Sequence, residues 1–405
     1  MKENHLPLIK LAGFGMGLFA VQTFWGFTWT TLPLYLKEIA NSNIVTGIIL
    51  STAGATGMIL PVLSGSISDR INTPLGRRRP FIVGGWLLAC TMVLLLLKVN
   101  TIAMALPLVI LAYAGFFTSI GPYFALLPDT VPHTQRSIAS GIMFFVGGLG
   151  MLSYLFFAAR LWDVSHSRPF YWAVIAVILA TAVMCLSVHE PEEHAAEEHS
   201  GNVLVAAFRH RNTAFFLSGM ILWWIGIWIV SAFFVITCKA LFQVSTALAV
   251  KAFFILNASF VLFALPAGLM AAKFGVKQVT MLGLLLLVIS FLTVPFIPSY
   301  TVVLPCMVMA GAGYGIMLAV SYPMFLKIVP PGKTAGYVGL YMGAQNGTLL
   351  VGPAVGGFLI DYYGYTTHFV GAALCILGGM ILLGAVRMPE EVPAVVPQPD
   401  LREMN

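Results

Sequence analysis

Apolar residues along this chain gather in long runs, and short polar segments separate one run from the next. A helix needs about 20 apolar residues to cross the hydrocarbon core of a bilayer, which matches the length of these runs. The runs predict twelve membrane-spanning helices, at residues 8–35, 44–67, 80–97, 102–127, 137–158, 169–188, 213–237, 246–271, 277–297, 301–326, 335–360 and 367–386. The fold class that this pattern predicts is an all-α membrane protein.

The composition supports a chain that is embedded in lipid. Of the 405 residues, 59% are hydrophobic and 9% are charged, whereas soluble proteins carry about 25% charged residues. The five cysteines all lie in apolar runs and form no CxxC pair, so the sequence predicts no metal site and no other cofactor. The sequence holds no GxxxxGK motif, and we expect neither an enzyme nor an ATP-driven pump.

The longest polar stretch, residues 189–212, divides the predicted spans into six and six. We therefore expect a six-helix bundle over residues 1–188, a cytoplasmic linker over 189–212 and a second six-helix bundle over 213–388. The linker holds histidines and glutamates that could indicate a metal site, but a solvated linker is the better interpretation. Residues 389–405 are rich in proline and acids, which predicts a disordered tail.

The two predicted bundles repeat each other in sequence. Matching positions are Val131 and Val329 as well as Gly141 and Gly339, each 198 apart, then Gly76 and Gly275, 199 apart, and Gly65 and Gly268, 203 apart. Each pair occupies the same place relative to its predicted helix. The repeat indicates two pseudo-symmetric halves.

The positive charges are distributed unevenly between the two sides of the predicted membrane. With both termini in the cytoplasm, 15 of the 21 Lys and Arg residues fall on the cytoplasmic side. This asymmetry is typical of membrane topology, which explains the net charge of +6 better than nucleic-acid binding does. We expect a multi-pass protein of the bacterial inner membrane, in contact with the lipid bilayer, monomeric and with both termini cytoplasmic.

One loop between two predicted helices carries an unusual set of charges. It reads GSISDRINTPLGRRRPFI over residues 65–82, and its motif residues are Gly65, Asp69, Arg70, Gly76, Arg77 and Arg78. The spacing resembles the cytoplasmic signature of the major facilitator superfamily. The ending GRRRPFI is more specific and resembles the sucrose transporters and the proton-associated sugar transporters, close to the glycoside–pentoside–hexuronide branch.

This resemblance implies a cytoplasmic latch. Gly65 would let the second helix approach a neighbour closely. Asp69 would engage a nearby arginine and the start of the eleventh helix, near Thr334, where a carboxylate is favoured by the helix dipole. The latch would favour the outward-open state. The alternative is that the arginines only hold the loop on the cytoplasmic side.

A second part of the chain is similar to the same branch. The segment ALLPD at 125–129, followed by Arg136, resembles the sucrose-transporter pattern, although Ser137 stands where that family has its arginine. The sucrose transporters are proton symporters, and no acid or histidine of this chain lies in the middle of a predicted span. If a proton is coupled, the role falls to Asp129 by elimination, with Arg136 as its possible ion-pair partner. An equally weighted alternative is that Asp129 is a structural acid at the helix end.

Amides and aromatic rings recur in the middle of the predicted spans of both halves. Gln22, Trp25 and Trp29 share one helical face, and Gln22 and Trp25 match the Gln-x-x-Trp of the sucrose transporters. Amides can bond sugar hydroxyls while aromatic faces cover the C–H faces of the ring. The predicted solute-binding residues are Gln22, Trp25, Trp29, Tyr123, Trp224, Trp228, Asn257, Tyr314, Tyr341, Gln345 and Asn346. Any single one of them could instead serve helix packing or an interfacial aromatic belt.

The predicted eleventh span contains Gly347, Gly352, Pro353, Gly356 and Gly357. We interpret these small residues as a packing seam between the halves. The function that the sequence predicts is transport of a small solute, a sugar or glycoside, by alternating access, with a proton as the candidate coupling ion. The alternatives are an exporter of amphipathic compounds or drugs, an uncoupled facilitator, and, with less support, a receptor or structural membrane protein.

Overall fold

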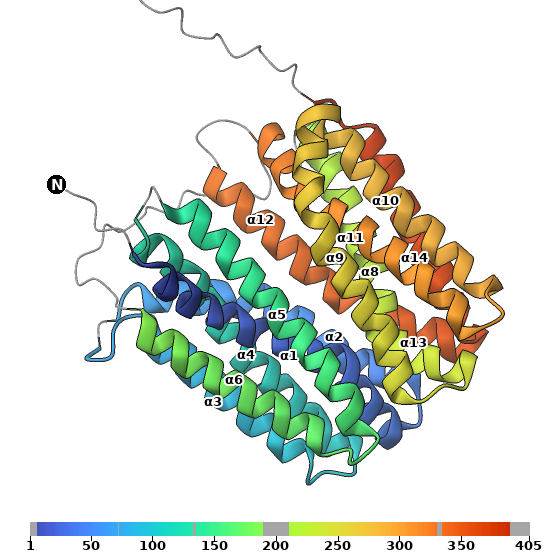
Figure 1. The fold of residues 1–405 in the computed structure, drawn as a ribbon, viewed down its shortest axis with the longest axis horizontal. Coiled ribbons are helices and arrows are strands. Elements are labelled where there is room, and N and C mark those ends of the chain that lie inside the picture. The colour runs from blue at the N-terminus through green and yellow to red at the C-terminus, as the bar shows by residue number, and fades with distance from the viewer. Residues whose placement is uncertain (1–5, 72, 133–134, 189–209, 330–333, 389–405) are drawn as a thin grey trace, which may run out of the picture.

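A computed structural model describes residues 6–71, 73–132, 135–188, 210–329 and 334–388 (Figure 1). Residues 189–209 of the predicted linker, the tail at 389–405 and the loop residues 330–333 lie outside the described residues, and Arg211 and Asn212 of that linker belong to a helix. The N-terminal bundle comprises α1 (Leu8–Ala40), α2 (Asn43–Ser68), α3 (Arg79–Leu96), α4 (Ile102–Thr130), α5 (Arg136–Trp162) and α6 (Arg168–Ser187). The C-terminal bundle comprises α8 (Arg211–Phe242), α9 (Thr246–Phe274), α10 (Val276–Thr293), α11 (Tyr300–Ile328), α12 (Thr334–Gly347), α13 (Gly352–Tyr363) and α14 (Thr367–Gly384). The described secondary structure is entirely helical, which confirms the predicted fold class.

The predicted eleventh span is not one continuous helix. In the described part of the chain, 11 helices are long and apolar enough to cross a membrane by themselves. The remaining span is built from α12 and α13, joined by a short 3-10 helix, Thr348–Leu350. Pro353 stands in the first turn of α13, where the N–H that proline lacks would have no partner within the helix. Proline inside a longer helix would remove a hydrogen bond and clash with the preceding turn, so the helix is interrupted before it. The expectation of an unbroken helix over 335–360 is therefore wrong.

The same helix pairs pack in the two bundles. In the N-terminal bundle α3 packs on α4, α2 on α4 and α1 on α6; in the C-terminal bundle α10 packs on α11, α9 on α11 and α8 on α14. Glycines make close contacts at equivalent places in both bundles: Gly85 faces Gly115, and Gly283 faces Gly313. Each member of the second pair stands 198 positions after its counterpart. The repeat predicted from sequence is thus a repeat in packing.

The bundles lie side by side in Figure 1, blue to green for the first and yellow to red for the second. We call the end of the molecule where α1 begins and α14 ends the terminal end, and the opposite end the distal end. At the distal end the bundles touch: a Cβ on Gly47 of α2 would lie 2.2 Å from the carbonyl oxygen of Pro353 in α13.

At the terminal end the helices that border the other bundle have open space beside them. A Cβ added there would meet no atom of the described residues within 4 Å at Gly65, Gly141, Gly268 or Gly339, which belong to α2, α5, α9 and α12. The structure is therefore a conformer that is closed at the distal end and open at the terminal end.

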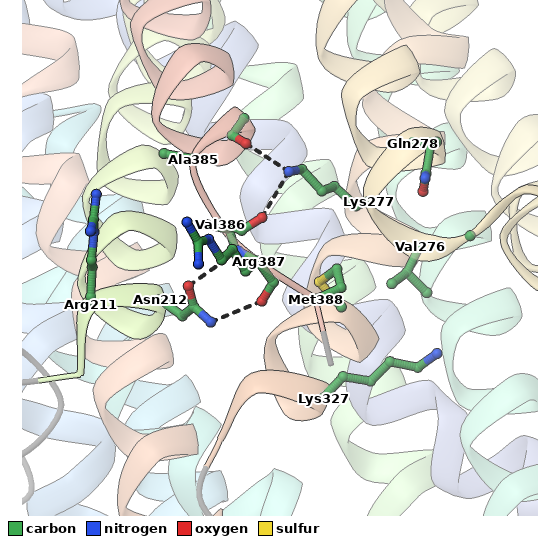
Figure 2. A pocket seen from close by; sticks show the side chains of 12 residues that line it. Arg211, Asn212, Val276, Lys277, Gln278, Lys327, Ala385, Val386, Arg387 and Met388 are labelled. Carbon is green, nitrogen blue, oxygen red and sulfur yellow. Dashed lines mark hydrogen bonds between the residues drawn. The ribbon is translucent and has the colours of Figure 1, made fainter. Parts of the chain in front are cut away.

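A basic pocket of about 770 Å³ lies at the terminal end of the C-terminal bundle (Figure 2). Nζ of Lys277 donates to the carbonyl oxygens of Gly384 at 2.7 Å and Val386 at 2.8 Å. The amide of Asn212 donates to the carbonyl of Arg387 at 2.9 Å and accepts from its N–H at 3.2 Å. These bonds cap the end of α14 and tie it to α8 and α10.

Candidate solute-binding cavity

A cavity of about 550 Å³ lies between the two bundles. Its wall comes from α1, α2, α4 and α5 of the first bundle and from α8, α9, α10, α11 and α12 of the second. Most of the wall is aliphatic or aromatic, and none of the described residues that line it is charged. The two bundles touch at one end, and the cavity lies between them. This position suits a binding site whose ligand contacts both halves.

Nine of the predicted solute-binding residues line this cavity: Gln22, Trp25, Trp29, Trp224, Trp228, Asn257, Tyr314, Gln345 and Asn346. They come from both halves of the chain, as the sequence repeat suggests. The set includes all of the predicted tryptophans and amides. The structure thus brings together residues that are more than 300 positions apart in the sequence.

Two predicted residues, Tyr123 and Tyr341, are not among the described residues that line the cavity. Tyr123 is buried, donates to the carbonyl of Phe14 at 3.1 Å and stacks on the Phe14 ring. Tyr341 is also buried, with its hydroxyl 3.4 Å from that of Ser321 and its ring against Phe325. Both rings pack within one bundle in this conformer, and their predicted contact with a solute stays a prediction.

Four tryptophans form a stack that crosses from one bundle to the other. Trp25 and Trp29 of α1 lie parallel with 5.4 Å between ring centroids. Trp29 stacks on Trp228 of α8 at 5.1 Å, and Trp228 stacks on Trp224 at 5.1 Å. Offset-stacked aromatic pairs contribute about 0.5–1.5 kcal/mol beyond their buried area. The stack therefore joins the bundles and gives the cavity a flat aromatic wall.

Hydrogen-bonding groups remain available beside this wall. Nε1 of Trp228 donates to Oγ1 of Thr348 at 2.9 Å, whereas the buried Nε1 of Trp224 has no acceptor among the described residues. The side-chain amides of Gln22, Gln345 and Asn346 likewise form no hydrogen bond to described residues. A buried donor without an acceptor is costly, and a bound solute or water relieves that cost.

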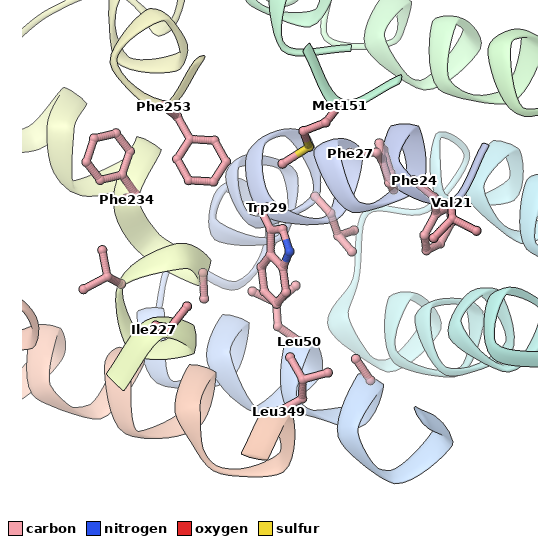
Figure 3. Close-up of a cluster of buried hydrophobic side chains, with 14 of the residues drawn as sticks. Val21, Phe24, Phe27, Trp29, Leu50, Met151, Ile227, Phe234, Phe253 and Leu349 are labelled. Atoms are coloured by element: carbon pink, nitrogen blue, oxygen red, sulfur yellow. The ribbon is translucent and has the colours of Figure 1, made fainter. Parts of the chain in front are cut away.

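Toward the distal end the cavity is sealed by apolar side chains (Figure 3). Figure 3 shows Leu50 of α2, Ile227 of α8 and Leu349 on one side of Trp29, and each of these residues is buried. Trp29 lies one helical turn further along α1 than Trp25, on the distal side. The aromatic stack thus forms the distal floor of the cavity.

The sequence analysis missed the phenylalanines of the wall. They are Phe117, Phe124, Phe144, Phe253, Phe260 and Phe291. A phenylalanine in an apolar span is equally suited to lipid, to packing and to a cavity, so its presence carries no signal. A polar or indole-bearing residue in midspan does carry one, because it is costly in lipid.

The predicted charged motif forms a cluster at the terminal end of the first bundle. Nη2 of Arg78 lies 3.1 Å from Asp69, and Nε of the same guanidinium bonds Asp129. Arg77 also reaches both acids, at 3.0 Å from Asp129 and 3.8 Å from Asp69. The cluster joins the ends of α2 and α4 to the start of α3. Asp129 is thus held by two arginines and does not line the cavity.

Arg136 was predicted as a possible ion-pair partner of Asp129, but its partners in the structure are backbone carbonyls. Its guanidinium donates to the carbonyls of Pro128 at 2.7 Å and Val131 at 3.2 Å, at the end of α4. A cation at a helix C-terminus is favoured by the helix dipole. Arg136 therefore caps α4 and is not an ion-pair partner of Asp129 among the contacts of the described residues.

The remaining motif residues frame the same loop. Gly76 has a φ of 102°, a backbone conformation that residues other than glycine rarely adopt. Arg70 is exposed. The close approach expected at Gly65 is not made in this conformer. Asp69 is 45% exposed, and the side chains around Thr334 that it was expected to meet lie outside the described residues.

Two similar halves of six spans each, around a central cavity lined by uncharged residues, are typical of a membrane carrier. The chain belongs to the Major Facilitator Superfamily, because the model of that family matches residues 14–261 and 240–403. It is therefore a multi-pass membrane transporter.

Curated relatives are distant. The chain is 22% identical over 368 residues to the tetracycline resistance protein, class H, of Pasteurella multocida, covering 88% of this chain and 89% of that protein. It is 23% identical over 168 residues to the quinolone resistance protein NorA of Staphylococcus aureus, covering 42% of each.

Solved structures confirm the fold. The nucleoside transporter NupG superposes with a TM-score of 0.77 at 15% identity, over 93% of this chain and 99% of that one. A bacterial homologue of the human lysosomal transporter Spinster, in an inward-facing and unoccupied conformation, gives 0.67 at 16% identity, over 95% and 96%. These relatives give no support to the narrower resemblance to sucrose transporters.

Proposed function

We propose that the protein is a secondary transporter that moves a small uncharged solute by alternating access. The observation that carries this proposal is the uncharged cavity between the bundles, in which indoles of both halves stand beside unpaired amides. We further propose that the terminal end faces the cytoplasm, as the distribution of Lys and Arg indicates, so that this conformer is inward-open. The transporter would act as a monomer in a bacterial inner membrane.

The first candidate solute class is a sugar or glycoside. Such a molecule presents hydroxyls to amides and a C–H face to an aromatic wall. Gln22 of α1 in the first half and Gln345 of α12 in the second both line the cavity, so one solute could bond both. Binding that requires both halves is what allows a solute to favour their closure.

The second candidate function is export of amphipathic compounds. It is favoured by the relatives named for tetracycline and quinolone resistance and by the wall of phenylalanines. A flat ring system could stack against Trp228, just as the C–H face of a sugar could. The two candidates differ in the direction of transport and in their need for the amides.

Proton coupling through Asp129 is a separate proposal. The acid lies in the cluster with Arg77 and Arg78, outside the cavity wall, so any proton effect would reach the solute through movement of α3 and α4. An uncoupled facilitator is the alternative.

The test is transport in vesicles with the purified full chain. Radiolabelled sugars and fluorescent amphipathic drugs are offered with and without a pH gradient. We expect at least one sugar to be carried, and its transport to fall in Trp228→Phe but not in Trp172→Phe. Trp172 of α6 is a partly buried indole that packs on Phe157 and is not among the described residues that line the cavity. Transport of drugs only would select the second candidate, and an effect of both substitutions alike would reject the cavity as the binding site.

A further inference from the structure

At the distal end a carboxylate of one bundle binds the first turn of a helix in the other. Asp361 stands near the end of α13, in the C-terminal bundle. It accepts hydrogen bonds from the backbone N–H of Ile44 at 2.9 Å and from the hydroxyl of Ser42 at 2.8 Å. A third bond comes from Nδ2 of Asn43 at 2.6 Å. All three donors belong to the start of α2, in the N-terminal bundle.

A second carboxylate makes the reciprocal contact. Asp163 directly follows α5, in the N-terminal bundle, and accepts from the backbone N–H of Ala247 at 3.3 Å. Ala247 lies in the first turn of α9, in the C-terminal bundle. Each of the two helix starts also has its own serine cap: Ser42 accepts from Val45, and Ser245 accepts from Leu248.

The two contacts are copies of each other under the internal repeat. Asp163 and Asp361 are 198 positions apart, which is the offset between Gly141 and Gly339. The donors Ile44 and Ala247 are 203 positions apart, as are the caps Ser42 and Ser245 and the glycines Gly65 and Gly268. A chance surface contact would not recur at equivalent places in both halves.

The chemistry of these contacts depends on the closure of the distal end. The first N–H groups of a helix lack partners within the helix and carry partial positive charge, so a carboxylate there is favoured. Here the carboxylate comes from the opposite bundle, so it can accept these hydrogen bonds only while the bundles touch. We infer that Asp163 and Asp361 are paired gate residues that hold the distal end closed and release it when the transporter opens toward that side.

The packing beneath Asp361 supports the gate. Gly357 of α13 lies so close to α2 that a Cβ on it would be 2.2 Å from the carbonyl oxygen of Asn43. Further along, Oγ of Ser51 in α2 accepts from the N–H of Ala354, in the first turn of α13. Each helix thus supplies an acceptor to the start of the other. The contact at Asp361 has three bonds and that at Asp163 has one longer bond, so we expect Asp361 to contribute more.

The test measures the conformer directly, with the full chain in liposomes and with the native cysteines replaced by alanine. Spin-label pairs at Asn100 and Phe296 report the distal end, and pairs at Leu75 and Phe274 report the terminal end, all of them exposed. Loss of charge-assisted hydrogen bonds predicts that Asp361→Ala shifts the equilibrium about tenfold toward distal opening. Asp163→Ala should shift it about threefold, and the double variant more than either.

Glu38→Ala is the matched control. Glu38 is also an acid at the distal end, but its partner His166, at 3.3 Å, belongs to the same bundle. Unchanged distal distances in the double variant, or an equal shift in Glu38→Ala, would overturn the gate. Asp361→Asn removes the charge and keeps the shape, so it serves if the alanine variant does not fold. The inference rests on the alternating access proposed above, but the distances are measured without any solute, so a failed transport assay leaves this test intact.

Discussion

The two ends of α2 show opposite arrangements within one helix. Near its start, Gly47 is pressed against the backbone of Pro353 in the other bundle, whereas Gly65, five turns later, has open space beside it among the described residues. The charged groups differ in the same way. At the distal end Asp361 bonds across the boundary, while at the terminal end Asp69 and its arginines bond within one bundle.

This difference indicates how the molecule can alternate. Contacts across the boundary define which end is closed, so the alternating access proposed above requires the distal contacts to break in the other conformer. The described ion pairs of the charged cluster around Arg78 lie inside the N-terminal bundle, so these groups can move together with it. The partly exposed Asp69 is then available for a contact across the boundary in the other conformer, which is the latch that the sequence motif predicts.

The largest effect is expected from filling the space at Gly47. A leucine there would overlap the carbonyl of Pro353, so Gly47→Leu should prevent distal closure and abolish both net transport and exchange. Gly65→Leu on the same helix should leave this conformer intact, and the labelled distances described above check both. If Gly47→Leu transports normally, the distal packing is not a gate.

The next effect concerns coupling at the terminal end. Asp129→Asn should abolish accumulation against a gradient while downhill exchange continues, because the neutral side chain can no longer change charge during the cycle. Both are measured in the same vesicles, before and after an ionophore collapses the proton gradient. Survival of accumulation in the variant would make Asp129 a structural member of the cluster. Wild-type transport that ignores the ionophore would identify a facilitator.

Substitutions in the cavity between the two ends should have a smaller effect on transport. Gln22→Ala and Gln345→Ala should each weaken apparent affinity about tenfold, since a lost buried hydrogen bond costs about 1–3 kcal/mol. Gln278→Ala is the control, because this amide lies at the basic pocket and not at the cavity. Concentration dependence of uptake, normalised to protein in the membrane, gives the values. Wild-type affinity in both cavity variants would show that the amides do not contact the solute.

The smallest effect is expected at Asp69. Asp69→Asn should slow cycling about threefold and shift the labelled pairs further toward the terminal-open conformer, because only a partly exposed carboxylate is neutralised. Insertion into the membrane should be unchanged. Arg70→Gln, at the neighbouring exposed position, controls for loss of one charge in the same loop. Equal behaviour of Asp69→Asn and the parent protein would leave the loop with a topological role alone.

The long apolar runs predicted where the spans lie, because lipid imposes that pattern locally, although the eleventh span consists of α12 and α13 and not of one helix. The face shared by Gln22, Trp25 and Trp29 was also predictable, because polar and indole groups in the middle of a span are costly in lipid unless they face a cavity or a partner. The break before Gly352 was not predicted, because an apolar run shows where a span lies and not where Pro353 interrupts its helix. The roles of Asp163 and Asp361 were not predicted, because a helix cap supplied by another bundle depends on tertiary structure that sequence neighbours do not reveal.

The tryptophan stack gives the protein an optical property of its own. Two indoles only 5.1 Å apart, Trp29 and Trp228, belong to opposite bundles, and the alternating access proposed above would separate and rejoin them in each cycle. Closely stacked indoles couple electronically, and that coupling falls steeply with distance. The near-ultraviolet circular dichroism of the unlabelled chain should therefore follow the motion of its halves, so that an unmodified sample reports its own state.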